Sequence, residues 1–152
     1  MTGDYFMSVA IRPATSDDLP RLLELYQLLG VGAEPELGLD QARRMFDALT
    51  SVPGHDVYVA ESEDVVVGTF GLIFIDGLAH GARCFGLVED VVVATDARGQ
   101  GIGKAMMRFA MQRCAERHCY KLALSSHLRR EAAHRFYEGL GFAKHGYSFL
   151  VA

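Results

Sequence analysis

The sequence predicts a mixed α/β domain of the α+β class, in which about four helices flank a central, mostly antiparallel twisted sheet. The first indication is the order of hydrophobic patterns, because runs with strand periodicity are combined with two early and two later amphipathic stretches. The second is length, since 152 residues correspond to about one domain. The third is composition, because 50% hydrophobic residues suffice for a core between a sheet and its helices. We therefore expect residues 1–152 to form a single domain.

The beginning of the chain predicts one strand and the start of a helix. Residues 9–12 have the composition of a strand, which Pro13 ends. Thr15 and Asp18 then have the spacing of a capping box, and Pro20 is tolerated in a first helical turn. The helix that follows has one apolar face, formed by Leu19, Leu22, Leu23 and Tyr26.

A second helix and a β-hairpin follow a glycine- and proline-bearing connection at residues 30–38. The helix is predicted over 39–49, with an apolar face formed by Ala42, Met45, Phe46 and Leu49. Residues 57–60 and 65–74 are rich in β-branched and aromatic side chains and flank a polar turn at 62–64, which predicts the hairpin. Residues 76–83 predict a turn or loop after it.

The remaining elements are a strand over 87–93, a helix over 101–118, a strand over 120–124 and a last helix. The buried stripe predicted for the first of these helices is Ile102, Met106, Phe109 and Ala110. The side chains predicted to face water are Lys104, Arg108, Gln112 and Glu116. In the last helix, helical spacing joins Ala133, Phe136, Tyr137 and Leu140, and Phe136 is predicted to be a core residue.

Charge and composition argue against several classes of partner. The formal net charge of −4 speaks against a nucleic-acid partner, which usually requires a basic face. No apolar run is as long as a membrane span, and residues 1–4 lack the basic region of a secretion signal. The cysteines Cys84, Cys114 and Cys119 are odd in number and lack paired spacing, which indicates reduced thiols and no metal site. We expect a cytoplasmic protein without nucleic-acid or membrane partners.

The segment Arg98–Gly103 is the most informative part of the sequence, because it combines glycines with the start of a helix. Its three glycines at alternate positions let the backbone approach a ligand closely and expose N–H groups. The following helix directs the positive end of its dipole at the loop. The spacing is neither that of a G-x-G-x-x-G dinucleotide turn nor that of a P-loop. The segment predicts a phosphate site, and a glycine-rich turn without a ligand is the alternative.

Two motifs in addition to this loop resemble the GCN5-related N-acetyltransferase (GNAT) family. The acetyl-CoA loop of that family has the pattern Arg/Gln-x-x-Gly-x-Gly/Ala, which Arg98, Gly101 and Gly103 match. The family's Phe-Tyr pair in a late helix and its Gly-Phe strand are matched by Phe136-Tyr137 and Gly141-Phe142. The resemblance extends from about residue 10 to the C-terminus. It implies the family fold, in which two splayed central strands, here ending at Val93 and spanning 120–124, admit the pantetheine arm.

The resemblance implies acetyl-CoA as the cofactor, with coenzyme A as a product. The central strand would offer backbone N–H and C=O groups to pantetheine, much as a neighbouring strand would. The residues that the resemblance assigns to the cofactor are Val91, Val92, Val93, Arg98, Gly99, Gln100, Gly101, Ile102, Gly103, Lys104, Ser126 and Tyr137. Ser125 and Ser126 stand where many family members carry an asparagine, so one cofactor hydrogen bond lacks its usual donor.

An acyl transfer to an amine also needs a group that takes the amine's proton, since an ordinary alkylamine is charged at neutral pH. Glu89 and Asp90 interrupt an apolar strand, where burial raises a carboxylate pKa toward a useful value. Strand alternation would direct only one of them to a given face. We favour Glu89, because residues 88–91 resemble those of the glucosamine-6-phosphate acetyltransferases. Asp90 is the alternative, because it aligns with the strand's acid in the aminoalkylphosphonate acetyltransferases.

Two further features complete the candidate site. Tyr137 is expected to be the general acid, because the resemblance places a tyrosine of this helix beside the thioester sulfur; a core aromatic is the alternative. A phenol with a pKa of ~10 is protonated at neutral pH and can donate. Arg129 and Arg130 predict a subsite for an anionic substrate group, since arginine matches phosphate and phosphonate geometry. A solvated helix cap is the alternative for these two residues.

The sequence thus predicts an N-acetyltransferase that uses acetyl-CoA by direct transfer to a primary amine of a small molecule, without a metal. A homodimer is considered as its assembly. One rival is an acetyltransferase of a protein or peptide amine. Another is a non-catalytic acyl-CoA-binding or sensor domain, which would not need Glu89, Asp90 and Tyr137. A third is a toxin that acetylates aminoacyl-tRNA, against which the acidic net charge speaks.

Overall fold

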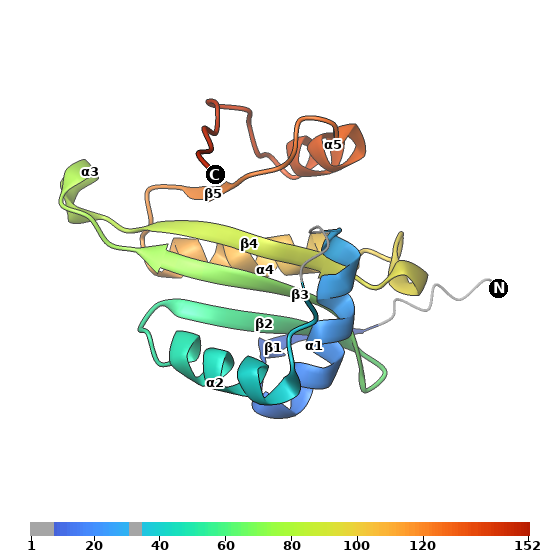
Figure 1. The fold of residues 1–152 in the computed structure, drawn as a ribbon. Coiled ribbons are helices and arrows are strands. Elements are labelled where there is room, and N and C mark those ends of the chain that lie inside the picture. Colours follow the sequence, from blue (N-terminus) through green and yellow to red (C-terminus); the bar gives the residue numbers. More distant parts are fainter. Residues whose placement is uncertain (1–7, 31–34) are drawn as a thin grey trace.

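The computed structural model describes residues 8–30 and 35–152, and its fold confirms the predicted α+β class (Figure 1). In this part of the chain, five strands form one sheet in the order β1-β2-β3-β4-β5. The pairs β1–β2, β2–β3 and β3–β4 are antiparallel, and β5 is parallel to β4. The strands are β1 (Val9–Pro13), β2 (His55–Ser62), β3 (Val65–Ile75), β4 (Phe85–Val93) and β5 (Leu122–Leu124). Residues 1–4 and part of the predicted connection at 30–38 lie outside the described residues.

Helices cover both faces of the sheet (Figure 1). Helices α1 (Leu19–Tyr26) and α2 (Leu39–Thr50) lie on one face, and α4 (Ile102–Glu116) lies on the other. Helix α5 (Glu131–Gly139) follows β5 and lies beside the end of β4 that leads into α4. These four helices are the predicted ones. The predicted loop at 76–83 contains a four-residue helix, α3 (Ala79–Ala82), whose backbone is left-handed at His80 and Gly81. Three short 3₁₀ turns occupy Ser16–Asp18, Gln27–Leu29 and Thr95–Ala97.

The core between the sheet and α4 depends on close approach of the helix to β3 and β4. Ile102, Met106 and Ala110 are buried as predicted, and the half-buried Phe109 ring lies 4.9 Å from the ring centroid of Tyr58. A Cβ atom at Gly68 would lie 2.9 Å from the Met106 sulfur, so this position of β3 has no room for a side chain. The helix that begins at the glycine loop is therefore fixed to the central strands along its buried face.

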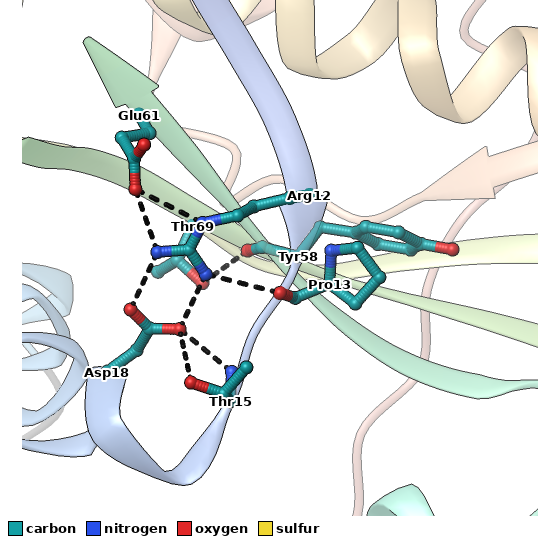
Figure 2. Close-up of polar contacts among 7 residues, drawn as sticks. All are labelled: Arg12, Pro13, Thr15, Asp18, Tyr58, Glu61 and Thr69. Atoms are coloured by element: carbon teal, nitrogen blue, oxygen red, sulfur yellow. Dashed lines mark hydrogen bonds and ion pairs between the residues drawn. The ribbon is translucent and has the colours of Figure 1, made fainter. Parts of the chain in front are cut away.

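A polar network ties β1 to the start of α1 (Figure 2). The Arg12 guanidinium donates to both carboxylate oxygens of Asp18, at 2.8 and 2.9 Å, and to Glu61 of β2 at 2.8 Å. The same Asp18 carboxylate accepts the backbone N–H of Thr15 at 2.8 Å, which is the acidic half of the predicted capping box. Hydrogen bonds from Arg12 hold the pKa of Asp18 below its ordinary value. The network fixes where the first helix starts against the sheet.

Two predictions about the C-terminal segment are wrong. Phe136 is not a core residue: it remains 37% exposed, because α5 packs on the core through Tyr137 and Leu140 while the Phe136 ring lies at the first turn of α4. The predicted Gly-Phe strand does not form either. Gly141, at a φ of +98°, ends the helix, and the backbone N–H of Phe142 donates to Tyr137 O at 3.1 Å. The residues after it are not part of the sheet and have no regular structure.

Candidate functional site

The two carboxylates predicted from the sequence lie at a β-bulge in β4. Glu89 pairs with Gly71 of β3 and Val92 pairs with Thr69, so Asp90 and Val91 together oppose a single residue, Phe70. Asp90 takes up the extra length with a φ of +51°. Strict alternation, on which we based the expectation that only one carboxylate faces a given side, does not apply at such a bulge. Both carboxylates are exposed, and both are available to a ligand.

Asp90 influences two other groups of the site. Burial is the main cause that raises the pKa of Glu89, and the negative charge of Asp90 adds to it. Burial likewise raises the pKa of the Tyr26 phenol at the end of α1, where the charge of Asp90 acts in the same direction. Tyr26 thus brings a neutral hydroxyl group near the carboxylates. From the sequence, Tyr26 was assigned only to the apolar face of its helix. The one sign that it could also contribute to the site is that this face ends in a residue with a hydroxyl group.

Strands β4 and β5 diverge after Val88, shortly before the bulge at Asp90 and Val91. Strands β4 and β5 pair only through Gly86–Leu122, Leu87–Ala123 and Val88–Leu124. Beyond Val88, nothing in the described ranges pairs with β4 on this side, while its other side remains paired with β3. Figure 1 shows the chain leaving β4 after β5 and continuing to α5. The splayed central strands are confirmed, and residues 91–93 present an open strand edge.

The glycine loop lies where β4 leads into α4. Gly99 and Gly101 have φ values of +76° and +81°, in the left-handed region that favours glycine, and a Cβ atom at either would meet nothing within 4 Å. Gly101 is the N-cap of α4, and its carbonyl accepts the N–H of Ala105 at 3.0 Å. The N–H groups of residues 102–104 therefore have no acceptor inside the helix. The exposed loop can bind an anionic oxygen group through backbone donors.

The side chains of the loop and of the adjoining strand and helix differ in their contacts and in their exposure. Arg98 donates from Nε to Val93 O at 3.3 Å and is exposed, so its guanidinium lies beside the open edge of β4. Gln100 donates to Asp96 O at 3.4 Å. The side chains of Val92 and Ile102 are buried in the core, so only their backbone atoms are available to a ligand. Lys104 is exposed on the first turn of α4, as predicted.

Helix α5 carries the predicted acid, Tyr137. The half-buried Tyr137 ring lies 5.1 Å from the centroid of Phe136 and 5.7 Å from that of Phe142. Burial raises the pKa of its phenol, and the charge of Arg130 acts in the opposite direction. The phenol therefore remains protonated at neutral pH. Before the helix, Ser126 has a buried Oγ atom without a partner among the described residues, so this hydroxyl can bond to a ligand.

The two arginines of the predicted anionic subsite are exposed at the start of α5. Arg130 is the residue that caps the helix, and its charge reaches Tyr137. The backbone N–H of Arg129 donates to His127 Nδ1 at 3.2 Å, which orders the turn before the helix. Neither guanidinium forms an ion pair within residues 8–30 and 35–152. Arg130 is thus a free cation close to the predicted acid.

Two other properties bear on the class of site. In the described part of the chain, no three His, Cys, Asp or Glu side chains are grouped so that they could hold a metal ion. None of the helices described is both long enough and apolar enough to cross a membrane.

Comparison with known proteins decides what this arrangement represents. The sequence model of the acetyltransferase (GNAT) family matches residues 19–142. The chain belongs to this family. Over 144 residues, which are 91% of this GNAT chain and 92% of the relative, it is 32% identical to a glucosamine 6-phosphate N-acetyltransferase of Trypanosoma brucei brucei. Over 142 residues, 93% and 90% of the two chains, it is 28% identical to an aminoalkylphosphonate N-acetyltransferase of Salmonella typhimurium.

Solved structures agree with the family assignment. An acetyltransferase from Trypanosoma brucei superposes with a TM-score of 0.83 at 29% identity, covering 95% of this chain and 99% of that one. The resemblance predicted from the loop, the Phe-Tyr pair and the Gly-Phe pair is confirmed, although the Gly-Phe pair forms no strand. The GNAT domain is an acyltransferase of the N-acetyltransferase type, with relatives named for small-molecule substrates.

Proposed function

We propose that this GNAT enzyme transfers an acetyl group from acetyl-CoA directly to the primary amine of a small molecule that carries an anionic group. The observation that carries the proposal is the gap in pairing between β4 and β5, which pair only as far as Val88 and Leu124. The gap has the glycine loop at one end of its β4 edge and Glu89 and Asp90 at the other. The loop suits a diphosphate, and the carboxylates suit an amine. The open edge of residues 91–93 between them suits the amide-bearing arm that joins the two.

Each chemical group of acetyl-CoA has a suitable partner among the residues along this gap. Backbone N–H groups of residues 99–104 and the charge of Arg98 would hold the diphosphate. Val91, Val92 and Val93 would pair with the pantetheine amides through backbone atoms. The unpartnered Oγ of Ser126 would satisfy one of the remaining polar groups of the cofactor. The bound cofactor supplies the thioester carbonyl that the amine attacks.

Protons are managed by the carboxylates and by Tyr137. A carboxylate at Glu89 takes the proton that the amine loses on attack, and its raised pKa makes it a stronger base than a glutamate with the ordinary pKa. Tyr137 holds a proton on its hydroxyl oxygen at neutral pH and donates it to the departing sulfur. Orientation of the reacting groups supplies much of the remaining acceleration, because it can lower the activation free energy by ~7–11 kcal/mol.

An anionic substrate group is supported by Arg129 and Arg130 and by the names of two relatives. Glucosamine 6-phosphate carries a phosphate, and an aminoalkylphosphonate carries a phosphonate. Arg130 caps α5, lies near Tyr137 and has no ion-pair partner in the described ranges. A phosphate held there would place the amine of the same small molecule between the carboxylates and the phenol.

A screen of amines for CoA release tests this function. Amino-sugar phosphates and aminophosphonates should give higher kcat/KM than polyamines, aminoglycosides or peptides. For the best phosphorylated amine, Arg130→Ala should raise KM roughly five- to tenfold, because an exposed charged hydrogen bond is lost, with acetyl-CoA affinity nearly unchanged. The matched control is the same amine without its phosphate, whose KM should not respond. Activity confined to peptides would contradict the small-molecule proposal.

The pH dependence of kcat/KM separates the two carboxylates. A base must be deprotonated, so activity should be lost as pH falls through the pKa of Glu89, which lies above its ordinary value. Glu89→Gln should remove this acidic limb. Asp90→Asn should keep the limb and move it to lower pH, because the charge of Asp90 contributes to the raised pKa. If instead Asp90→Asn removes the limb, the base is Asp90.

We also propose that the enzyme is a cytoplasmic homodimer. The dimer is supported by the exposed apolar side chains after Phe142, among which Phe149 is 92% exposed, and by the outer edge of β5, which no strand of the described residues pairs with. The location is supported by three free cysteines, which persist as thiols in reducing compartments. Light scattering should give twice the chain mass, and removal of residues 143–152 should give the monomer. A full-length monomer would contradict the dimer.

A further inference from the structure

Three thiols gather where the last turn of α4 meets the paired end of β4 and β5. Cys84 directly precedes β4, Cys114 lies in the last turn of α4, and Cys119 lies in the connection from α4 to β5. The Sγ atoms of Cys84 and Cys119 are 2.8 Å apart, in hydrogen-bond contact. These two residues are 35 positions apart in the sequence, so their spacing gave no indication of the contact.

The backbone holds Cys84 and Cys119 side by side. The N–H of Tyr120 donates to Cys84 O at 3.0 Å, which continues the parallel pairing of β4 with β5 toward the start of both strands. Neighbouring strands lie about 4.8 Å apart, and a disulfide joins Cα atoms about 4.4–6.8 Å apart. From 2.8 Å, the two sulfurs need to approach each other by less than about 1 Å to reach a covalent distance. A disulfide between them therefore requires little movement of the backbone.

The third thiol is fixed on the core side of this group. Cys114 is 6% exposed, and a Cβ atom at Gly86 would collide with its sulfur, so this sulfur packs directly against β4. The backbone N–H of Cys119 donates to Cys114 O at 3.0 Å, which ties the connection to the end of the helix. Cys119 is the most exposed of the three, and the sulfur in contact with it is that of Cys84.

We propose that Cys84 and Cys119 form a reversible disulfide in the presence of a small-molecule disulfide, and that this bond clamps the paired end of β4 and β5. The Cys119 thiolate attacks one sulfur of the oxidant, whose S–S bond breaks, and one small thiol leaves. The Cys84 thiolate then attacks the Cys119 sulfur of the mixed disulfide, and the second small thiol leaves. The protons of the two protein thiols end on the two released thiols, and the protein gives two electrons to the oxidant.

Exposure and burial determine the order and the rates of these steps. Cys119 is half-buried and can be reached by an oxidant, whereas Cys84 is buried. Burial raises the pKa of the Cys119 thiol to about 12, so its thiolate is scarce at neutral pH and the first step is slow. The second step is fast, because it joins two groups that are already in contact. The mixed disulfide should therefore not accumulate in the wild-type protein.

The proposed bond would close a loop that contains β4, the glycine loop and α4. A link of this kind stabilises a protein mainly by restricting its unfolded chain. The open edge at residues 91–93 lies at the other end of β4, so acetyl-CoA binding should be similar in the reduced and oxidised forms. The inference goes beyond the proposed acetyl transfer and does not depend on it.

Incubation with oxidised glutathione at mildly alkaline pH tests the inference. Thiol titration should show that two of the three thiols are lost, and peptide mapping should find Cys84 joined to Cys119 within one chain. The melting temperature should rise by roughly 5–10 °C, because the closed loop is long, and dithiothreitol should reverse the rise.

Alanine variants separate the roles of the three thiols. Cys84→Ala should stop at the mixed disulfide on Cys119, gain the mass of one glutathione and show no rise in melting temperature. Cys114→Ala removes a neighbouring buried thiol and is the matched control, which should keep both the disulfide and the rise. If Cys84→Ala is unfolded, Cys119→Ala decides the question, because its remaining thiols should stay free.

The remaining outcomes contradict the inference. It is overturned if all three thiols of the folded wild-type protein stay free under conditions that oxidise the denatured chain. A bond between Cys114 and Cys119, or one between two chains, also overturns it, and an unchanged melting temperature of the oxidised protein overturns the clamp. Calorimetry with acetyl-CoA on both forms tests the proposed function separately. Binding by neither form would overturn the cofactor site and leave the disulfide unaffected.

Discussion

Replacing Gly101 with glutamate should weaken acetyl-CoA binding by on the order of 100-fold. Gly101 caps α4 in the left-handed region, and its missing side chain leaves open space on the face where the diphosphate is proposed to lie. A carboxylate there would stand about 5 Å from a phosphate, where two unit charges repel by about 3 kcal/mol at an effective dielectric constant of ~20. A tenfold loss of affinity corresponds to about 1.4 kcal/mol, so repulsion of this size gives the stated factor.

The matched control is Gly101→Gln, which has the same size and the same unfavourable φ without the charge. Both variants should lose about 1–2 kcal/mol of stability, because a side chain at a φ of +81° is strained. Calorimetry should place the affinity of the glutamine variant between those of the wild-type and glutamate proteins, and thermal melting should show all three folded. Near-normal affinity of a folded Gly101→Glu protein would contradict the assignment of the diphosphate to this loop.

The sequence was sufficient for those parts of the site that depend on local backbone chemistry. The helix starts at Ile102, next to the glycine loop, as the pattern predicted. The glycines at 99 and 101 have positive φ values, a conformation that suits glycine. Only the family resemblance predicted that β5 stops pairing with β4 after three residues. Nothing in residues 120–124 distinguishes a three-residue edge strand from a longer one.

Tertiary contacts determined what the sequence did not predict. The bulge at Asp90 arises because two residues of β4 oppose Phe70, and strand alternation alone cannot show it. Phe136 has the spacing of a core residue, but the close approach of α5 to Gly103 leaves its ring partly exposed. Arg108 of α4 and Arg135 of α5 line one cavity from two different helices, so no local motif contains both.

Tyr137→Phe should lower kcat by at least about tenfold while leaving acetyl-CoA affinity unchanged. The substitution removes one hydroxyl group and keeps the ring that packs 5.7 Å from Phe142, so no cavity opens in the core. General acids contribute ~10²–10⁴-fold to many reactions, and the loss of a proton donor near the sulfur should fall within or near this range. Tyr120→Phe, which also removes a single phenolic hydroxyl, is the matched control and should keep full activity.

The alkaline side of the pH profile gives an independent test of this role. A general acid must be protonated, so activity should be lost only as pH rises through the pKa of Tyr137, which burial raises above its ordinary value of ~10. The wild-type kcat should therefore stay level from neutral pH to at least about pH 10. A fall in kcat near neutral pH that persists in Tyr137→Phe would assign the donor to another group, and full activity of the variant would leave Tyr137 only a packing role. If kcat falls together with acetyl-CoA affinity, the hydroxyl positions the cofactor and does not donate the proton.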